Sequence, residues 1–236
     1  MSHVSSPKGI RELFRPGVDA VREGLRPFLL IQCCAVAAVL AFYFWPAFQG
    51  AADQLRRVKD AGGLAFSGLA TACAGVVLPE IARRVTLGTK SQARHLVFQA
   101  AVFAVIGITV DLLYRLLAVL IGNEPSPSVV IRKVLIDQFV YSPSISILIS
   151  TVAFLWEAEG FSLRKTREAL AHGGFLQRYL PILITCWCFW IPVNAATYSL
   201  PTRVQFILFL CAQGAWSLLL VHIASGQAAR SRAGAS

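Results

Sequence analysis

Long apolar stretches separated by short charged segments are the dominant pattern of this 236-residue chain. The apolar stretches lie near residues 27–49, 62–79, 96–122, 138–156, 179–199 and 204–224. About 17–25 such residues, wound as a helix, cross the roughly 30 Å hydrocarbon core of a bilayer. The pattern therefore predicts an all-α, polytopic transmembrane helix bundle with about six spans.

Three segments between or beyond these stretches have a different character. Residues 1–26 form a basic N-terminal segment, which is read either as an amphipathic helix on the membrane surface or as a solvated tail. Residues 159–178 carry a helix signature with Ser162 as its N-cap, and predict an interfacial connecting helix. The small, polar residues 226–236 predict a disordered tail, which leaves 27–225 as the transmembrane bundle.

Composition and charge support the membrane prediction. Only 14% of the residues are charged and 56% are hydrophobic, whereas soluble domains are about a quarter charged. The net charge of +10 does not predict nucleic-acid binding, because the basic residues are spread over the segments between apolar stretches. A six-span arrangement places 15 of the 22 basic residues on the side of the termini, 6 on the other side and Arg115 within a span. By the positive-inside rule, both termini are predicted to lie inside.

The N-terminal segment also bears on which membrane hosts the protein. It contains the acidic residues Glu12, Asp19 and Glu23, which mitochondrial presequences lack. A bacterial inner membrane is therefore favoured, with a mitochondrial inner or peroxisomal membrane as the alternative. The lipid bilayer is the expected partner, small solutes are candidate ligands, and a homo-oligomer is compatible with such a bundle.

Ionisable residues inside a span are costly and are hypotheses for function by default. Asp111 and Arg115 stand four residues apart in the third span, where they can pair on one helix face. The pair is read either as a structural bond between helices or as part of a polar lining. Asp137 opens the fourth span, and there it is read either as a group that caps the helix or as a second lining residue.

Several polar residues from different spans fall on one side of the predicted topology. This convergence predicts a water-accessible outer vestibule, lined by Asp111, Arg115, Asp137, Gln138, Asn194, Tyr198 and Arg203. Pro192 lies inside the fifth span and is expected to kink it. The small residues Gly68, Ala72 and Gly75 are expected to let the second span pack closely on a neighbour.

Motifs for catalysis, metal binding or cofactors are not found. The six cysteines lie in apolar stretches without the Cys–His spacing of a zinc site, and no phosphate-binding loop or nucleophile elbow occurs. The sequence therefore predicts neither an enzyme nor a metal or cofactor protein.

The C-terminal two-thirds of the chain resembles the Mpv-seventeen and twenty-two-kilodalton peroxisomal membrane protein family. The stretch KVLIDQFVYSP, with Lys133, Asp137, Gln138 and Pro143, is similar to the family's lysine, Asp-Gln, proline pattern. The stretch WIPVNAATYSLPTRVQF is similar to its later Trp-Pro, proline, arginine pattern. The resemblance covers roughly residues 65–225. In an upstream stretch, Ile108 and Leu113 depart from the family's proline and tryptophan.

The resemblance implies an integral protein of an organelle or similar membrane, of a family proposed to form weakly selective channels and to influence membrane homeostasis. The leading hypothesis is therefore a small-solute channel or membrane-permeability protein. The alternatives are a non-conducting structural or assembly protein of the membrane, and a proton-coupled transporter with Asp111 as its titrating carboxylate.

Overall fold

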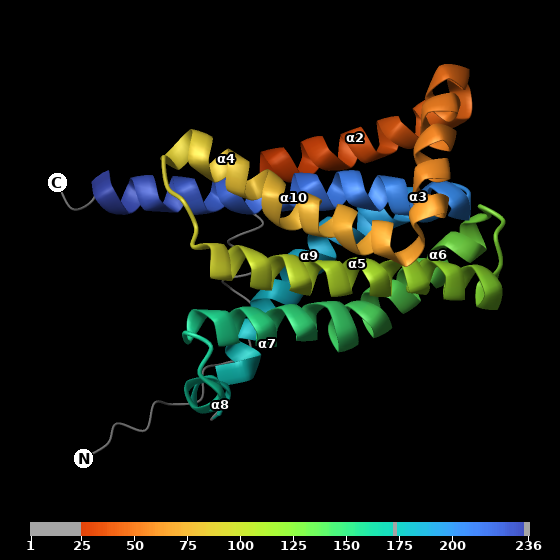
Figure 1. The fold of residues 1–236 in the computed structure, drawn as a ribbon. Coiled ribbons are helices and arrows are strands. Elements are labelled where there is room, and N and C mark those ends of the chain that lie inside the picture. Colours follow the sequence, from red (N-terminus) through yellow and green to blue (C-terminus); the bar gives the residue numbers. More distant parts are fainter. Residues whose placement is uncertain (1–24, 172–173, 234–236) are drawn as a thin grey trace, which may run out of the picture.

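The computed structural model describes residues 25–171 and 174–233, and the part it describes is helical. The elements are α2 (Leu25–Phe44), α3 (Pro46–Ala72), η1 (Cys73–Val77), α4 (Leu78–Leu87), α5 (Ala93–Ile121), α6 (Pro127–Ile136), η2 (Asp137–Ser146), α7 (Ile147–Ala158), α8 (Leu163–Leu170), α9 (Gly174–Tyr198) and α10 (Thr202–Ala233). Figure 1 shows most of these helices aligned along one direction, as in a bundle.

Four helical segments are long and apolar enough to cross a bilayer: Pro46–Thr86, Ala93–Ile121, Pro127–Ala158 and Gly174–Tyr198. A shorter apolar helix, Phe28–Phe44, accompanies them. The all-helical prediction is therefore confirmed, and five of the six predicted apolar stretches coincide with these segments. The sixth stretch falls in α10, where most side chains beyond Leu218 lie outside the described part of the structure.

The helix surfaces have the character of lipid-facing surfaces. α5 buries Ile106 and Leu113 but leaves Leu116 and Val119 exposed. A helix that is apolar all round belongs in the core of a large protein or in a membrane. These outward apolar side chains have no protein cover, which suggests a membrane-embedded protein.

The core of the bundle is built around α5. Its buried side chains Val110, Tyr114 and Leu117 pack with Tyr198 of α9 and Phe209 of α10. On the other side α5 lies against α3, where the backbones come close. A Cβ atom at Gly107 would stand 2.6 Å from the Ser67 carbonyl oxygen, so only glycine fits there.

The small residues predicted to pack the second span face this same contact. Gly68 lies beside Ile108, and a Cβ atom at Gly75 would stand 2.6 Å from the Phe103 ring. Ala72, between them, is buried. The close approach of α3 and α5 thus depends on small residues on both helices.

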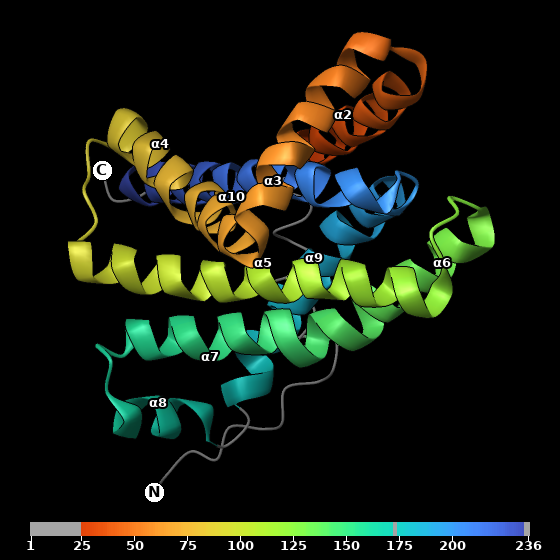
Figure 2. The same ribbon diagram turned by 45° about the vertical axis from the view of Figure 1, so that its right-hand side comes forward.

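α3 changes direction at Gly63, whose φ of 54° and ψ of −140° break the helical path. A positive φ is readily adopted by glycine because it has no Cβ atom. Figures 1 and 2 show residues 46–62 inclined across one end of the bundle, while the rest of α3 runs along it. From the sequence, residues 50–61 were expected to form an outer loop. In the structure they are helical, and Lys59 on this helix contacts Asp111 of α5.

Two π-helical segments, η1 and η2, occur at prolines. η1 ends two residues before Pro79 of α4, and η2 contains Pro143. Proline has no N–H group and crowds the carbonyl four residues before it, so the regular hydrogen-bond ladder is interrupted there. Wider turns of this kind occur frequently at functional sites. η2 carries Asp137 and Gln138, two of the predicted vestibule residues.

The helix ends and connections agree in part with the sequence. Ser162 caps α8, since its hydroxyl accepts a hydrogen bond from the Lys165 N–H, as predicted. α9 continues as one helix through Pro192. α10 reaches Ala233, so residues 226–233 are helical although the sequence predicted a disordered tail. The N-terminal segment, apart from its last two residues, and residues 234–236 lie outside the described residues.

Candidate functional site

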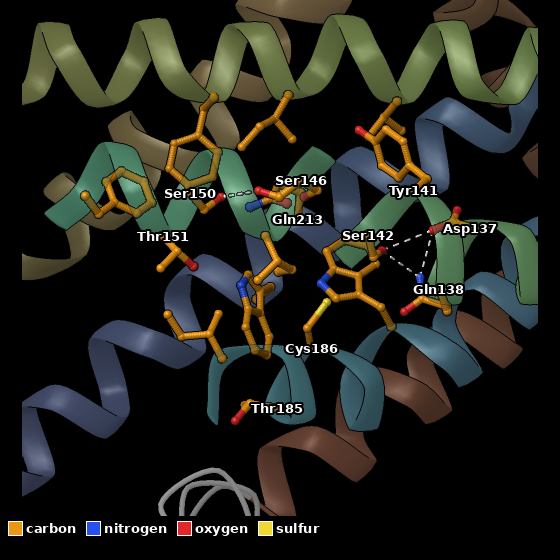
Figure 3. A pocket seen from close by; sticks show the side chains of 18 of the residues that line it. Asp137, Gln138, Tyr141, Ser142, Ser146, Ser150, Thr151, Thr185, Cys186 and Gln213 are labelled. Carbon is orange, nitrogen blue, oxygen red and sulfur yellow. Dashed lines mark hydrogen bonds between the residues drawn. The ribbon is translucent and has the colours of Figure 1, made fainter. Parts of the chain in front are cut away.

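A cavity of about 680 Å³ lies between α5, η2, α7, α9 and α10. This volume is within the usual range of small-molecule sites. Its walls are mostly apolar and aromatic, and include Ile106, Phe154, Leu155 and Trp190. Polar side chains line it from three directions: Asp137, Gln138, Ser142, Ser146, Ser150 and Thr151 from η2 and α7, Asn194 from α9, and Gln213 from α10. Figure 3 shows the polar side chains of η2 and α7, together with Gln213, around one space.

The exposure of the lining changes along the cavity. At one end Gln138 is 1% exposed and Asn194 is 3% exposed. At the other end Ala158 and Arg178 are both exposed. We call the first the deep end and the second the mouth. The cavity is therefore accessible from the side of the bundle where α7 ends and α9 begins.

Asp137 is the centre of a hydrogen-bonded group at the deep end. The Tyr198 hydroxyl donates to Asp137 Oδ2 at 2.5 Å, and Gln138 Nε2 donates to Asp137 Oδ1 at 2.8 Å. The Ser142 hydroxyl contributes a longer bond of 3.4 Å to Oδ1. Figure 3 shows Asp137, Gln138 and Ser142 together at one end of the cavity. Asp137 is 4% exposed, so protein donors replace most of the water that a carboxylate requires.

Asp137 does not cap a helix, although the sequence offered that reading. α6 runs into η2 without interruption, and the backbone N–H of Asp137 bonds to the carbonyls of Lys133 and Val134. The carboxylate instead accepts hydrogen bonds from Gln138 and Ser142 of η2 and from Tyr198 of α9. The sequence changes from polar to apolar near residue 137, which was interpreted as a helix start. In the structure no helix begins there.

Tyr198 closes the deep end behind Asp137. Its ring packs edge-on against Tyr114, with centroids 5.4 Å apart, and the Lys133 Nζ lies 5.8 Å above the ring centroid. All three side chains are buried, and Tyr198 is not part of the cavity lining. The Tyr198 ring therefore lies outside the cavity, next to Asp137 at its deep end.

Lys133 was identified in the sequence only through the family resemblance. It is 1% exposed, and among the described residues no carboxylate lies within ion-pair distance of it. Its ammonium group interacts with the π face of Tyr198, which favours a cation. Tyr198 thus contacts both Lys133, through its ring, and Asp137, through its hydroxyl, and these two residues lie four apart on one continuous helix.

Three polar oxygens of the lining have no partner in the protein. Gln138 Oε1, Asn194 Oδ1 and Thr151 Oγ1 are buried and form no hydrogen bond with any described residue. Buried polar atoms are almost always paired, because leaving one unpaired costs about 1–3 kcal/mol. Of the five such atoms among the described residues, three line this one cavity. The polar side chains around this cavity are therefore not fully paired within the described part of the protein.

A second polar cluster joins α3 to α5 outside the cavity. Lys59 Nζ donates to Asp111 Oδ1 at 2.7 Å, and the Ser67 hydroxyl donates to Asp111 Oδ2 at 2.9 Å. Arg115 also bonds Oδ2 at 2.9 Å, as the four-residue spacing predicted. The Lys59 side chain is 11% exposed and that of Arg115 is 54% exposed. Lys59 is therefore the main partner of the buried Asp111 carboxylate.

The residues predicted to line an outer vestibule thus fall into four groups. Asp137, Gln138 and Asn194 line the cavity, at its buried end rather than at an accessible mouth. Tyr198 lies behind Asp137, and Asp111 and Arg115 belong to the α3–α5 cluster. Arg203 is exposed on α10 and does not line the cavity.

The sequence missed Lys59 and Ser67 because the nearer Arg115 offered an obvious partner for Asp111 in the same span. It also missed the hydroxyls of Ser146, Ser150 and Thr151, which in apolar helices commonly bond their own backbone. Ser150 does so, but Thr151 is left without a partner.

We found no family model that matches this chain, and no curated protein or solved structure that matches it significantly. The resemblance stated from the sequence therefore remains an expectation, and the function must be argued from the cavity itself.

Proposed function

We propose that this chain is an integral membrane protein of about six spans whose cavity forms part of a weakly selective path for small solutes. The observation that carries the proposal is the cavity of about 680 Å³, which reaches from exposed residues at its mouth to the buried polar residues Asp137, Gln138 and Asn194 at its deep end. A bilayer surrounds such a bundle with apolar lipid, so polar groups inside it need a structural or a solute partner.

The proposed path is gated, because its deep end is closed. Solutes enter from the mouth and reach Asp137, where the Tyr198 ring blocks further passage. In this proposal passage requires the ring to move, because Tyr198 is held in place by its contacts with Tyr114 and Asp137. The side chains needed for passage are those of Asp137, Gln138 and Asn194 in the lining and of Tyr198 at the constriction.

The expected result of replacing Asp137 with alanine is a loss of solute flux of about tenfold or more. Polar solutes exchange hydration for contacts with the lining, and a hydrogen bond to a charged group contributes about 1.5–3 kcal/mol. The measurement is release of a small polar solute from liposomes that contain purified protein. Helical content measured by circular dichroism ensures that only folded protein is compared.

Asp60→Ala is the matched control for this experiment. It removes a carboxylate from α3 that is more than half exposed and lies outside the cavity, so flux should stay at the wild-type level. Equal flux from wild type and a folded Asp137→Ala variant would refute the assignment of the cavity as the path.

The α3–α5 cluster favours a second candidate, a non-conducting structural or assembly protein. Lys59, Asp111 and Ser67 lie outside the cavity and join two helices, which is a structural role. In such a protein the cavity would be occupied by a lipid chain or a partner rather than by a passing solute. Absence of flux above that of protein-free liposomes would favour this second function.

A further inference from the structure

The cavity is long and narrow. Arg178 at its mouth and Asn194 at its deep end both lie on α9, and at a rise of about 1.5 Å per residue they stand about 24 Å apart along the helix axis. The facing wall, from Asp137 of η2 to Ala158 at the end of α7, also runs the length of the cavity. A volume of about 680 Å³ spread over this length suits one extended chain better than a compact ligand.

The walls are apolar over most of this length. Four helices contribute large apolar side chains to them, among which are Phe103, Ile106, Ile147, Phe154, Trp190 and Trp216. The hydroxyl of Ser150, which lies in the same stretch, donates to the backbone carbonyl of Ser146 and is already paired. Contact with such walls stabilises apolar ligand surface in proportion to the area that it removes from water. The body of a matching ligand is therefore an alkyl chain.

Among the described residues, Arg178 at the mouth has no carboxylate partner. Its Nη1 donates to the carbonyl oxygens of Ala169 at 2.8 Å and Gly174 at 3.2 Å, which hold the side chain in place. Glu168, on the same helix as Ala169, pairs with Arg164 instead. The Nε and Nη2 atoms of Arg178 form no hydrogen bond with a described residue. These two N–H groups share one edge of the guanidinium, where a carboxylate binds through two parallel hydrogen bonds.

The charges at the two ends of the cavity decide how an anion would be oriented in it. The Asp137 carboxylate at the deep end already accepts three hydrogen bonds from neighbouring side chains, and it would repel a second carboxylate. Arg178 attracts the same group at the mouth. A cationic head would meet the opposite situation, because Arg178 would repel it at the entrance. A negatively charged head therefore stays at the mouth while its chain extends inwards.

The position of α8 agrees with this orientation. α8 joins two of the segments that are long enough to cross a bilayer, and Arg164, Lys165 and Arg167 are exposed on it. Figure 2 shows it beside the end of α7, at one end of the bundle. A helix with such a charged face is expected to lie at the membrane surface. Arg178 bonds to the last turn of α8, so we expect its guanidinium at the depth of the lipid headgroups.

We propose that the cavity binds a long-chain fatty acid, with its carboxylate at Arg178 and its alkyl chain along the apolar walls towards the deep end. A fatty acid has a single chain, which suits one narrow cavity, whereas a diacyl phospholipid carries two. The inference goes beyond the proposed function and does not rest on it, because a bound chain needs one opening whereas a passing solute needs two.

The test measures how 16-bromohexadecanoate quenches the tryptophan fluorescence of the purified protein, in neutral detergent at alkaline pH. Bromine quenches tryptophan on contact, and Trp190 and Trp216 line the cavity. 16-Bromohexadecanol, with the same chain and a neutral head, reports how far the chain alone accounts for quenching. We expect saturable quenching by the fatty acid at a concentration at least about tenfold lower than the alcohol requires. Equal quenching curves for the two ligands would overturn the inference.

Arg178→Gln is the decisive variant, because it removes the charge but keeps a side chain that can donate to a carbonyl. It should weaken binding of the fatty acid by about tenfold or more and leave binding of the alcohol unchanged. Arg178→Lys keeps the charge without the bidentate edge and should give an intermediate affinity. Arg167→Gln, which removes an exposed arginine of α8 outside the cavity lining, is the control and should bind as wild type does. Normal binding by folded Arg178→Gln, or an equal loss in Arg167→Gln, would contradict the proposed site.

The position of the chain is tested by removing the two tryptophans of the lining. A protein with both Trp190→Phe and Trp216→Phe keeps the other three tryptophans, which do not line the cavity. Saturable quenching by 16-bromohexadecanoate should disappear in it. Saturable quenching of unchanged size would place the chain elsewhere and overturn the inference.

The outcomes separate this inference from the proposed function. Fatty-acid binding that depends on Arg178, together with no flux in liposomes, would support the fatty-acid site and refute the solute path. Flux that depends on Asp137, together with no preference for the fatty acid over the alcohol, would support the path and overturn the fatty-acid site.

Discussion

Replacement of Asp111 by leucine is expected to destabilise the protein by about 3–5 kcal/mol. The change leaves the Lys59 ammonium buried next to apolar side chains, without the carboxylate that it contacts at 2.7 Å. Removing one partner of a buried pair is costly because the other charge remains without compensation. The measurement is chemical unfolding in detergent, followed by the fluorescence of the five tryptophans.

Two further variants identify which lost interaction destabilises Asp111→Leu. Lys59→Met combined with Asp111→Leu should recover most of the stability, because no buried charge is left unpaired. Arg115→Ala should cost less than about 1 kcal/mol, since the Arg115 side chain is 54% exposed and Lys59 still pairs with Asp111. If Arg115→Ala were as damaging as Asp111→Leu, or if the double variant showed no recovery, Lys59 would not be the main partner of Asp111.

Removal of the Tyr198 ring is expected to raise solute flux by about tenfold or more. The ring fills the space behind Asp137 and contacts Tyr114 and Lys133, so its loss opens the deep end of the cavity. Each 1.4 kcal/mol taken off a barrier gives a tenfold faster step. The measurement is solute release from liposomes that contain Tyr198→Ala, normalised to the amount of folded protein.

Tyr198→Phe is the control for this effect. It keeps the ring but removes the hydroxyl that donates to Asp137, so flux should rise far less than in Tyr198→Ala. Because a buried ring replaced by alanine can cost about 3–5 kcal/mol of stability, Tyr198→Leu provides a second opening with a smaller cavity. Unchanged flux in both folded ring-less variants would show that Tyr198 is not the constriction.

The sequence predicted the parts of the site that depend on local spacing. Asp111 and Arg115 pair because residues four apart share a helix face. Ser162 caps α8 because its position before the apolar stripe is typical of an N-cap. Both features are settled within one or two turns of chain, which is the distance over which a sequence pattern is informative.

The sequence was less successful where the answer depends on tertiary packing. Lys59 and Asp111 are 52 residues apart, and no local signal connects them. Their contact requires the turn at Gly63 and the close approach of α3 to α5 at Gly107. Tyr198 was expected to line a vestibule, but it packs against Tyr114 and Lys133 outside the cavity lining.

The convergence of polar groups was predicted in part for a sound physical reason. Asp137, Gln138 and Asn194 occur near the same ends of neighbouring antiparallel spans, so they lie at a similar depth and meet in the cavity. Arg203 satisfies the same argument but follows the turn into α10 and faces outwards. Depth along the bundle can be read from the sequence, whereas the direction of a side chain around its helix axis is decided by packing.

The most direct test of the solute path is a reversible block inside the cavity. Ser146 lines the cavity, whereas Ser144 on the same π-helical segment is exposed and does not. Each is changed to cysteine in a Cys186→Ala background. Cys186 is removed because it also lines the cavity, whereas the other five cysteines do not and remain the same in both variants. Solute release from liposomes is then measured before and after a cationic methanethiosulfonate reagent, and again after reduction. We predict that the reagent blocks solute release through Ser146→Cys, that reduction restores it, and that release through Ser144→Cys is unaffected. Equal release through Ser146→Cys before and after labelling would contradict the account.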